Sequence, residues 1–322
     1  MCSYAGDIMY NSIVVLGPTA CGKTALAVQL AYALGGEIIS ADSRQVYKGL
    51  DIGSGKDLNE FDLPISDGKI FHVPYHLIDV VSLPTEYSVY DFQQDAYRAF
   101  SKITEKKALP VIVGGTGMYL DSLVRGYDLV KVPVNHALRQ ELSGATMEEL
   151  INRLVQEKGQ LHNSTDLTER HRLIRAIEIA IYSKVKPVEK AQMPSRPEIK
   201  PLILGTTFPR DILRSNIKLR LRSRLKEGMI EEVKKIHDSG IEWQQLERLG
   251  LEYRFVSEYL QGKILSQDKL FSGLNVAIGQ FAKRQETWFR GMERKGIKIN
   301  WLEPGSVDQR FKEAMNIIGT SF

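Results

Sequence analysis

Residues 17–24 read Gly17-Pro18-Thr19-Ala20-Cys21-Gly22-Lys23-Thr24, and this stretch decides the fold class. It has the Gly-x-x-x-x-Gly-Lys-Thr pattern of a phosphate-binding loop, in which backbone N–H groups surround phosphate oxygens. The apolar residues 12–16 before it predict a buried strand, and residues 25–34 after it predict a helix. The N-terminus of such a helix adds partial positive charge. The segment therefore predicts an anion site, where Lys23 reaches the outer phosphate and the Thr24 hydroxyl binds Mg²⁺.

Three further apolar stretches extend the same architecture. Residues 37–41, 110–113 and 201–205 predict buried strands that alternate with helical segments. Continuous apolar strands of this kind are typical of a parallel sheet with helices on both faces. We therefore predict an α/β fold, a P-loop NTPase-like parallel sheet flanked by helices, with a helical insertion domain.

The insertion is predicted at residues 128–197, where helical patterns at 148–158 and 168–183 occur without a convincing strand. Three prolines mark the loop that returns to the sheet: Pro187, Pro194 and Pro197. Residues 1–127 and 198–322 then form the core that carries the phosphate loop, and this core ends in basic helices.

The net charge of +4 is unevenly distributed, with −7 in residues 1–169 and +11 in residues 170–322. A basic second half favours a polyanionic partner, although scattered and solvated Lys and Arg side chains give the same count. No apolar run approaches the ~18 residues of a membrane span. The two cysteines, Cys2 and Cys21, suit a reducing compartment. We expect a cytoplasmic protein that does not associate with a membrane and acts as a monomer.

Asp42 directly follows the predicted strand 37–41. The loops after parallel strands meet at one edge of the sheet, so Asp42 and the phosphate loop are expected to share a crevice. There the carboxylate could accept a proton from an attacking nucleophile. The other interpretation is an N-cap for a short helix that begins at Ser43.

The strand 110–113 ends in glycines, whereas hydrolytic P-loop proteins usually carry an acidic residue there for Mg²⁺. Asp79 is a weaker candidate for that acidic residue. The pattern therefore favours a transferase over a simple NTPase.

Seven more blocks of sequence accompany the phosphate loop. They are Asp42-Ser43-Arg44-Gln45-Val46-Tyr47, Asp51-Ile52-Gly53, His76-Leu77-Ile78-Asp79, Gly114-Gly115-Thr116-Gly117-Met118-Tyr119-Leu120, His171-Arg172-Leu173-Ile174-Arg175-Ala176-Ile177-Glu178, Gly250-Leu251-Glu252-Tyr253-Arg254 and Lys283-Arg284-Gln285-Glu286-Thr287-Trp288-Phe289-Arg290. Together the eight blocks resemble the tRNA dimethylallyltransferases, in that family's order. The resemblance implies transfer of a dimethylallyl group from dimethylallyl diphosphate to N6 of the adenosine 3′-adjacent to the anticodon in tRNA.

The resemblance also implies roles for single residues. Asp42 corresponds to the general base, while Thr19 and Arg220 join Lys23 and Thr24 at the diphosphate and its Mg²⁺. The residues that correspond to tRNA contacts near the reacting base are Asp42, Ser43, Arg44, Gln45 and Thr116. The resemblance makes residues 1–127 and 198–322 the catalytic core, and the insertion 128–197 is expected to contact tRNA. Further contacts to the tRNA anticodon stem-loop are predicted at Arg139, Arg172, Arg175, Arg254, Lys283, Arg284, Gln285, Thr287 and Arg290.

Local sequence leaves several alternatives open. On local sequence alone, arginines such as Arg172 and Arg175 more often pair with Glu178 or with water, and the block 283–290 also fits an ordinary amphipathic surface helix. The alternative functions are an adenylate isopentenyltransferase that acts on free nucleotides, a P-loop small-molecule kinase, and a nucleic-acid-binding NTPase.

Cys21 stands where the family usually has Ser. Inward-facing amides and the nearby Lys23 would stabilise a thiolate at this position. We therefore hypothesise that alkylating agents modify Cys21 and inactivate the enzyme, and that diphosphate protects it.

Overall fold

The computed structural model of the chain describes residues 10–65, 68–159, 169–185 and 196–320. Cys2 and the loop predicted at Pro187 and Pro194 lie outside these residues. The chain divides into two compact units, with boundaries between residues 127 and 128 and between residues 196 and 197. Each unit is described by itself below.

The larger unit is built on a six-stranded sheet in which every neighbouring pair is parallel. Its order is β5-β2-β6-β1-β7-β8. The strands are β1 (Ser12–Leu16), β2 (Gly36–Ser40), β5 (Tyr75–His76), β6 (Leu109–Gly114), β7 (Pro201–Gly205) and β8 (Asn300–Trp301). The predicted α/β class and its four predicted strands are confirmed. The outer strands β5 and β8 were not predicted, because two residues carry no periodic signal.

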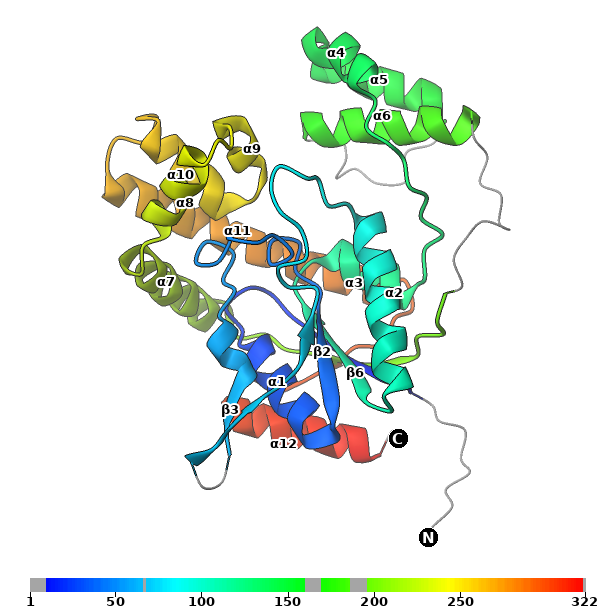
Figure 1. The fold of residues 1–322 in the computed structure, drawn as a ribbon, viewed down its shortest axis with the longest axis vertical. Coiled ribbons are helices and arrows are strands. Elements are labelled where there is room, and N and C mark those ends of the chain that lie inside the picture. Colours follow the sequence, from blue (N-terminus) through cyan, green and yellow to red (C-terminus); the bar gives the residue numbers. More distant parts are fainter. Residues whose placement is uncertain (1–9, 66–67, 160–168, 186–195, 321–322) are drawn as a thin grey trace. The chain divides into compact units, whose positions relative to one another are not determined.

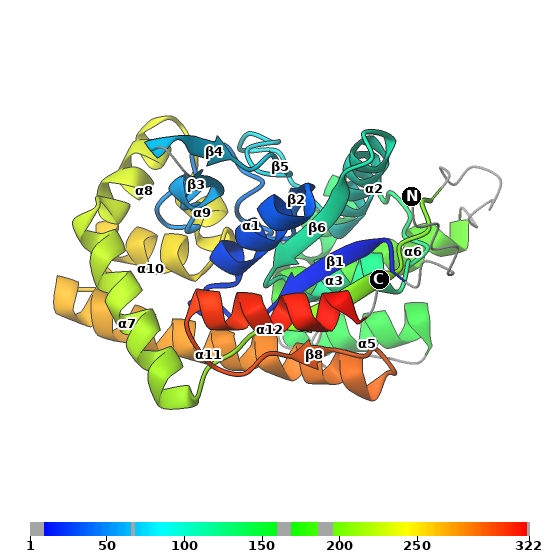
Figure 2. The same ribbon diagram turned by 90° about the horizontal axis from the view of Figure 1, so that it is seen from below.

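Helices cover both faces of this sheet, as the predicted architecture requires (Figures 1 and 2). Val14 and Leu16 of β1 belong to the apolar core beneath α2 (Val89–Glu105), α3 (Gly117–Val124) and the end of α11 (Gln267–Arg294). Ile13 and Val15 belong to the opposite core, beneath α1 (Lys23–Leu34) and α12 (Val307–Gly319). Alternate side chains of one strand therefore anchor both layers.

A group of helices packs around a third apolar core in the same unit. Its members are α7 (Arg210–Lys226), α8 (Met229–Asp238), α9 (Trp243–Arg248), α10 (Leu251–Leu260) and the first part of α11. The segment after β2 contributes Val46, Tyr47 and Leu50 to this core. It continues through a 3₁₀ turn, η1 (Leu58–Phe61), into an antiparallel hairpin of β3 (Asp62–Pro64) and β4 (Ile70–His72). The helix group thereby holds the segment that follows Asp42.

The smaller unit is helical in its described part. It contains α4 (His136–Glu141), the 3₁₀ turn η3 (Leu142–Gly144), α5 (Met147–Lys158) and α6 (Arg170–Val185). Leu150 and Leu154 of α5 pack against Leu173 and Ile177 of α6. None of the helices in the described parts of either unit is long and apolar enough to cross a membrane.

Glu178 is the charged centre of this helical unit and is 2% exposed. Its carboxylate accepts hydrogen bonds from Arg139 Nε at 2.8 Å, from Arg175 Nη1 at 3.0 Å and from the Asn135 amide at 3.0 Å. Arg175 also donates to the Val132 carbonyl oxygen. Burial alone would raise the pKa of Glu178, but these hydrogen bonds outweigh it and lower the pKa below its ordinary value.

Glu178→Ala should destabilise the helical unit, because two arginines would lose their shared carboxylate. Breaking a buried ion pair costs about 3–5 kcal/mol, and the lower end applies here because both arginines keep some access to water. Because folding lowers the pKa of Glu178, its carboxylate stabilises the fold at pH values above 4.5, the pKa of an unperturbed Glu. This stabilisation is lost as the pH falls through the lower pKa of the folded state. Urea unfolding at pH 7 and pH 4 measures both effects. Glu148→Ala, at an exposed carboxylate of the same unit, is the control. Equal losses of unfolding free energy in Glu178→Ala and Glu148→Ala would contradict the stabilising role of Glu178.

Candidate active site

The phosphate loop lies at the carboxyl edge of the sheet, between β1 and α1. Strand β6 separates β1 from β2, so the loops that carry Thr116 and Asp42 leave the same edge. A cavity of about 350 Å³ opens against the phosphate loop. It is lined by Ala20, Gly22, Lys23, Thr24, Glu60, Asn216, Leu219 and Arg220. Four predicted loop residues and the predicted Arg220 therefore share one cavity, and Gly17, Pro18, Thr19 and Cys21 do not line it.

The backbone of the phosphate loop is held in an unusual conformation. Ala20 and Gly22 both have positive φ, 61° and 71°, which turns the chain so that successive N–H groups can face an anion. Gln285 of α11 bridges this loop to the end of β6. Its Oε1 accepts from the Thr19 amide at 2.9 Å, and its Nε2 donates to the Gly115 carbonyl oxygen at 2.7 Å.

Gln285 was predicted to bind tRNA, and the structure corrects this prediction. The side chain is 7% exposed, and both ends of its amide bond to the protein. The residue faces inward on α11, so it supports the loop and offers no polar atom to a nucleic acid. The amide N–H of Thr19 is likewise engaged by Gln285, which separates this N–H from the cavity.

Charges of both signs meet in the cavity. Arg220 donates to Asp57 Oδ2 at 2.6 Å and to the Gly55 carbonyl oxygen at 3.4 Å. Glu60 and Thr24 both line this cavity. Burial raises the pKa of the Glu60 carboxyl, and the nearby Asp57 adds to the rise. Glu60 was missed in the sequence because no motif marks it, and only the fold of η1 brings it beside the phosphate loop.

Asp42 lies in a tight turn after β2. Its Oδ1 accepts from the Arg44 amide at 2.9 Å, and residues 43–46 form a turn rather than the short helix considered above. Thr116 closes this turn, since its Oγ1 accepts from the Ser43 amide at 3.0 Å. Asp42 is partly exposed and does not line the cavity. The turn thus holds one carboxylate oxygen and leaves the side chain accessible.

Gln45 was predicted to touch tRNA, but its side chain is engaged within the protein. Its Oε1 accepts from the Ser40 hydroxyl at 2.9 Å, and its Nε2 donates to the Gly55 carbonyl oxygen at 3.1 Å. Arg44 reaches the Arg248 carbonyl oxygen at 3.5 Å. Gln45 therefore ties the Asp42 turn to the loop 51–57.

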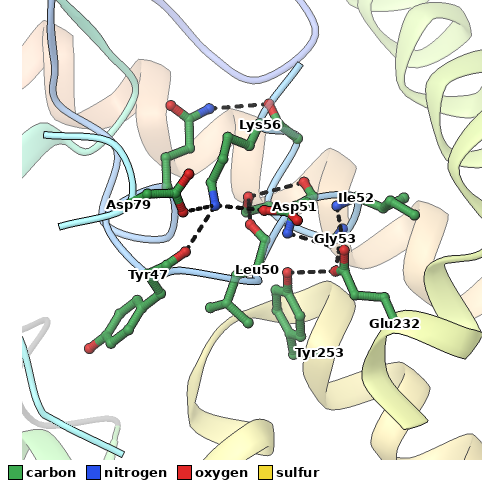
Figure 3. Close-up of polar contacts among 12 residues, drawn as sticks. Tyr47, Leu50, Asp51, Ile52, Gly53, Lys56, Asp79, Glu232 and Tyr253 are labelled. Carbon is green, nitrogen blue, oxygen red and sulfur yellow. Dashed lines mark hydrogen bonds and ion pairs between the residues drawn. The ribbon is translucent and has the colours of Figure 1, made fainter. Parts of the chain in front are cut away.

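The loop 51–57 is held by a buried ammonium group (Figure 3). Lys56 Nζ donates to Asp51 at 2.7 Å, to Asp79 at 2.5 Å and to the Tyr47 carbonyl oxygen at 2.9 Å, and its side chain is fully buried. Asp79 was the weaker candidate for a magnesium ligand. Its ion pair with Lys56 gives it a structural role instead.

Glu232 of α8 clamps the same loop (Figure 3). Its carboxylate accepts from the backbone amides of Asp51, Ile52 and Gly53 at 3.1, 2.6 and 3.0 Å. The Tyr253 hydroxyl adds a fourth hydrogen bond at 2.9 Å. Burial, with Glu232 nearby, raises the pKa of Tyr253 well above its ordinary value, so the phenol stays a donor. The helix group thus fixes the loop that bonds to Arg220.

The remaining predicted tRNA contacts separate into two groups. Exposed side chains are Arg172, Arg254, Lys283, Arg284, Thr287 and Arg290. Arg139 and Arg175 are partly buried and donate hydrogen bonds to Glu178. The alternative of pairing with Glu178 is confirmed for Arg175, and tRNA contacts of Arg139 and Arg175 stay predictions. The exposed cations stay predicted phosphate contacts.

The fold and the phosphate loop define an α/β protein of the P-loop class. Residues 45–292 match the family model described as IPP transferase, and residues 10–62 match that of isopentenyl transferase. The chain is 55% identical over 295 residues to tRNA dimethylallyltransferase 2 of Treponema denticola, covering 91% of this chain and 96% of that protein. It is 50% identical over 311 residues to tRNA dimethylallyltransferase 1 of Geotalea daltonii, covering 97% and 96%. The chain therefore belongs to the IPP transferase family.

Solved structures agree with this assignment. The tRNA isopentenylpyrophosphate transferase of Bacillus halodurans has a TM-score of 0.67 and 30% identity, covering 97% of this chain and 96% of that one. A eukaryotic dimethylallyltransferase acting on tRNA has a TM-score of 0.69 over 96% of this chain and 77% of that one. At 22% identity, the second likeness bears on the fold alone.

The structure contradicts the hypothesis of a reactive Cys21. The side chain is fully buried, and this burial is the main cause that raises the pKa of the thiol above its ordinary value, while Lys23 and Arg310 oppose the rise. The thiol is therefore protonated and shielded at neutral pH.

Iodoacetamide at pH 7.5 should leave Cys21 unmodified in the folded protein, because the reactive thiolate is neither formed nor accessible. Full modification is expected after denaturation in guanidinium chloride. Mass analysis of a Cys2→Ser background, in which Cys21 is the remaining cysteine, measures both states. Rapid stoichiometric labelling of the folded chain would restore the original hypothesis.

Proposed function

We propose that this chain transfers a dimethylallyl group from dimethylallyl diphosphate to N6 of the adenosine 3′-adjacent to the anticodon in tRNA. The product is N6-(dimethylallyl)adenosine. One observation carries the proposal: in a member of the IPP transferase family, the cavity at the phosphate loop gathers Lys23, Thr24 and Arg220. These side chains supply the positive charge and the hydroxyl group that can hold a diphosphate as a leaving group.

The leaving group is the first chemical problem. As the allylic C–O bond breaks, negative charge grows on the diphosphate, and fixed donors around it lower the barrier. Lys23 and Arg220 supply positive charge from two walls of the cavity. The loop amides and the N-terminus of α1 supply aligned dipoles. Arg220 is anchored by Asp57 and the Gly55 carbonyl oxygen, so its orientation is set before the substrate binds.

The nucleophile is the second problem, because the lone pair of an adenine amine is drawn into the ring. Asp42 is placed to accept a proton from this amine. The Arg44 amide holds its Oδ1, and no other donor within the described part of the chain engages its Oδ2. A positioned general base contributes about 10²–10⁴-fold in rate.

Access to the base requires that tRNA be held while the adenine leaves its stack, at a cost of a few kcal/mol. Contacts from cations to phosphates offset such a cost. Lys283, Arg284 and Arg290 on α11 and Arg254 on α10 are exposed and suited to this role. That the partner is the anticodon stem-loop, and that the enzyme is a cytoplasmic monomer, stay predictions.

A Mg²⁺ ion fits the residues of the cavity. The Thr24 hydroxyl and the partly buried Glu60 carboxyl both line the cavity, and burial with the nearby Asp57 raises the pKa of Glu60, so a bound cation would stabilise its charged form. Hard oxygen ligands of this kind, completed by diphosphate oxygens and water, are what Mg²⁺ prefers. The ion would neutralise part of the diphosphate charge. We propose Thr24 and Glu60 as the residues that would hold it.

Asp42→Asn should lower the turnover number about 10²–10⁴-fold, since the amide cannot take the proton. The KM for the prenyl donor should change little, because Asp42 does not line the cavity. The assay is mass analysis of an anticodon stem-loop incubated with dimethylallyl diphosphate and Mg²⁺. Parallel reactions with AMP as acceptor, and with γ-labelled ATP, test the free-nucleotide and kinase alternatives. Wild-type activity in Asp42→Asn would remove this residue from the mechanism.

Mg²⁺ should improve the affinity for pyrophosphate about tenfold less in Glu60→Gln than in the wild type, because one anionic ligand of the ion is lost. Calorimetric titration of pyrophosphate at several Mg²⁺ concentrations measures this without turnover. Glu105→Gln, at an exposed carboxylate on α2, is the matched control. A Mg²⁺ dependence that is the same in both variants would refute the ligand role.

A further inference from the structure

Arg310 of the last helix, α12, is buried against the back of the phosphate loop and is 2% exposed. Its Nη1 donates to the Cys21 carbonyl oxygen at 2.7 Å and also to the Thr206 hydroxyl. The guanidinium lies over the ring of Phe208, with 5.1 Å from Cζ to the ring centroid. Figure 2 shows α12 running along α1, next to β1. A residue near the end of the chain thus contacts a loop near its beginning.

The contact with Cys21 sets the direction of the next amide. In a trans peptide, the carbonyl oxygen and the amide hydrogen point to opposite sides. Since the Cys21 carbonyl oxygen points at Arg310, the N–H of Gly22 points away from Arg310. Gly22 lines the cavity, so this N–H is available to an anion there. The left-handed φ of 71° at Gly22 belongs to this arrangement.

The guanidinium also touches the loop directly. A Cβ atom added to Gly22 would come within 3.0 Å of Arg310 Nη2. The positive charge is therefore packed under the backbone of the loop rather than beside it. Burial lowers the pKa of Arg310 from its ordinary value, yet a guanidinium remains charged at every physiological pH.

This charge lacks an acidic partner among the residues that the structure describes. Among the described residues no carboxylate forms an ion pair with Arg310, and its hydrogen bonds go to carbonyl and hydroxyl oxygens. A buried cation without a countercharge is costly. An anion in the cavity on the other side of Gly22 would supply the missing negative charge.

We propose that Arg310 is a positioning residue of the diphosphate site: it aims the Gly22 amide into the cavity and balances the diphosphate charge from behind the loop. The inference rests on the proposed role of the loop as a diphosphate site. It makes α12 part of the substrate site, a role that neither the phosphate-loop motif nor the cavity lining reveals.

Calorimetric titration with inorganic pyrophosphate and Mg²⁺ tests the proposal. Arg310→Met removes the charge and keeps an apolar filler, and the Kd should rise about 10–100-fold. Arg310→Lys keeps the charge but loses the forked geometry, so it should recover part of the affinity. Lys312→Met removes a charge from an exposed position on the same helix and should bind as the wild type does.

The kinetic readout separates positioning from general loss of structure. Arg310→Met should raise the KM for dimethylallyl diphosphate while the KM for the anticodon stem-loop stays unchanged. The proposal is overturned if Arg310→Met binds pyrophosphate like the wild type, or if Arg310→Lys is folded and no better than Arg310→Met. Should Arg310→Met fail to fold, Arg310→Lys decides, since an unchanged Kd in that variant also overturns it. Failure of the wild type to bind pyrophosphate would instead refute the proposed function itself.

Discussion

The left-handed backbone of the phosphate loop is the constraint on which the rest of this structure depends. A loop with two left-handed residues, Ala20 and Gly22, is not the conformation that a free chain prefers. Distant parts of the chain hold it from opposite sides. Gln285 of α11 joins it to the end of β6, and Arg310 of α12 fixes the Cys21 carbonyl. The anion site is therefore prepared by packing before any ligand arrives, which reduces the reorganisation that binding would require.

The sequence predicts well those features that are encoded locally. The strands at 12–16 and 201–205 and the glycine pattern at 17–24 depend on neighbours a few residues apart, and the structure has these strands at the predicted places. The sheet class follows from the same short apolar runs. The two-residue strands β5 and β8 form because neighbouring strands offer backbone groups for pairing, so their own sequences do not predict them.

Side-chain roles were harder to predict, because partners far along the chain decide them. Gln285 and Thr19 are 266 positions apart, so the sequence around Gln285 could not predict that its side chain supports the phosphate loop. Arg139 is 39 positions from Glu178. Cys21 looked reactive by its neighbours in sequence, but burial outweighs the nearby cations and keeps the thiol protonated. In each case the tertiary environment overrides the chemistry that the residue type suggests.

The two halves of the proposed chemistry meet at a single backbone atom, the Gly55 carbonyl oxygen. Gln45, next to the Asp42 turn, donates to it at 3.1 Å, and Arg220, from the wall of the cavity, donates to it at 3.4 Å. The loop that carries Gly55 cannot shift freely, because Lys56 and Glu232 bind it on both sides of that residue (Figure 3). The hydrogen bond from Gln45, next to the Asp42 turn, therefore shares its acceptor with one that orients Arg220. Under the proposed function, this shared loop would set the distance between the carbon donor and the purine amine, and catalysis by proximity needs that distance to be held closely.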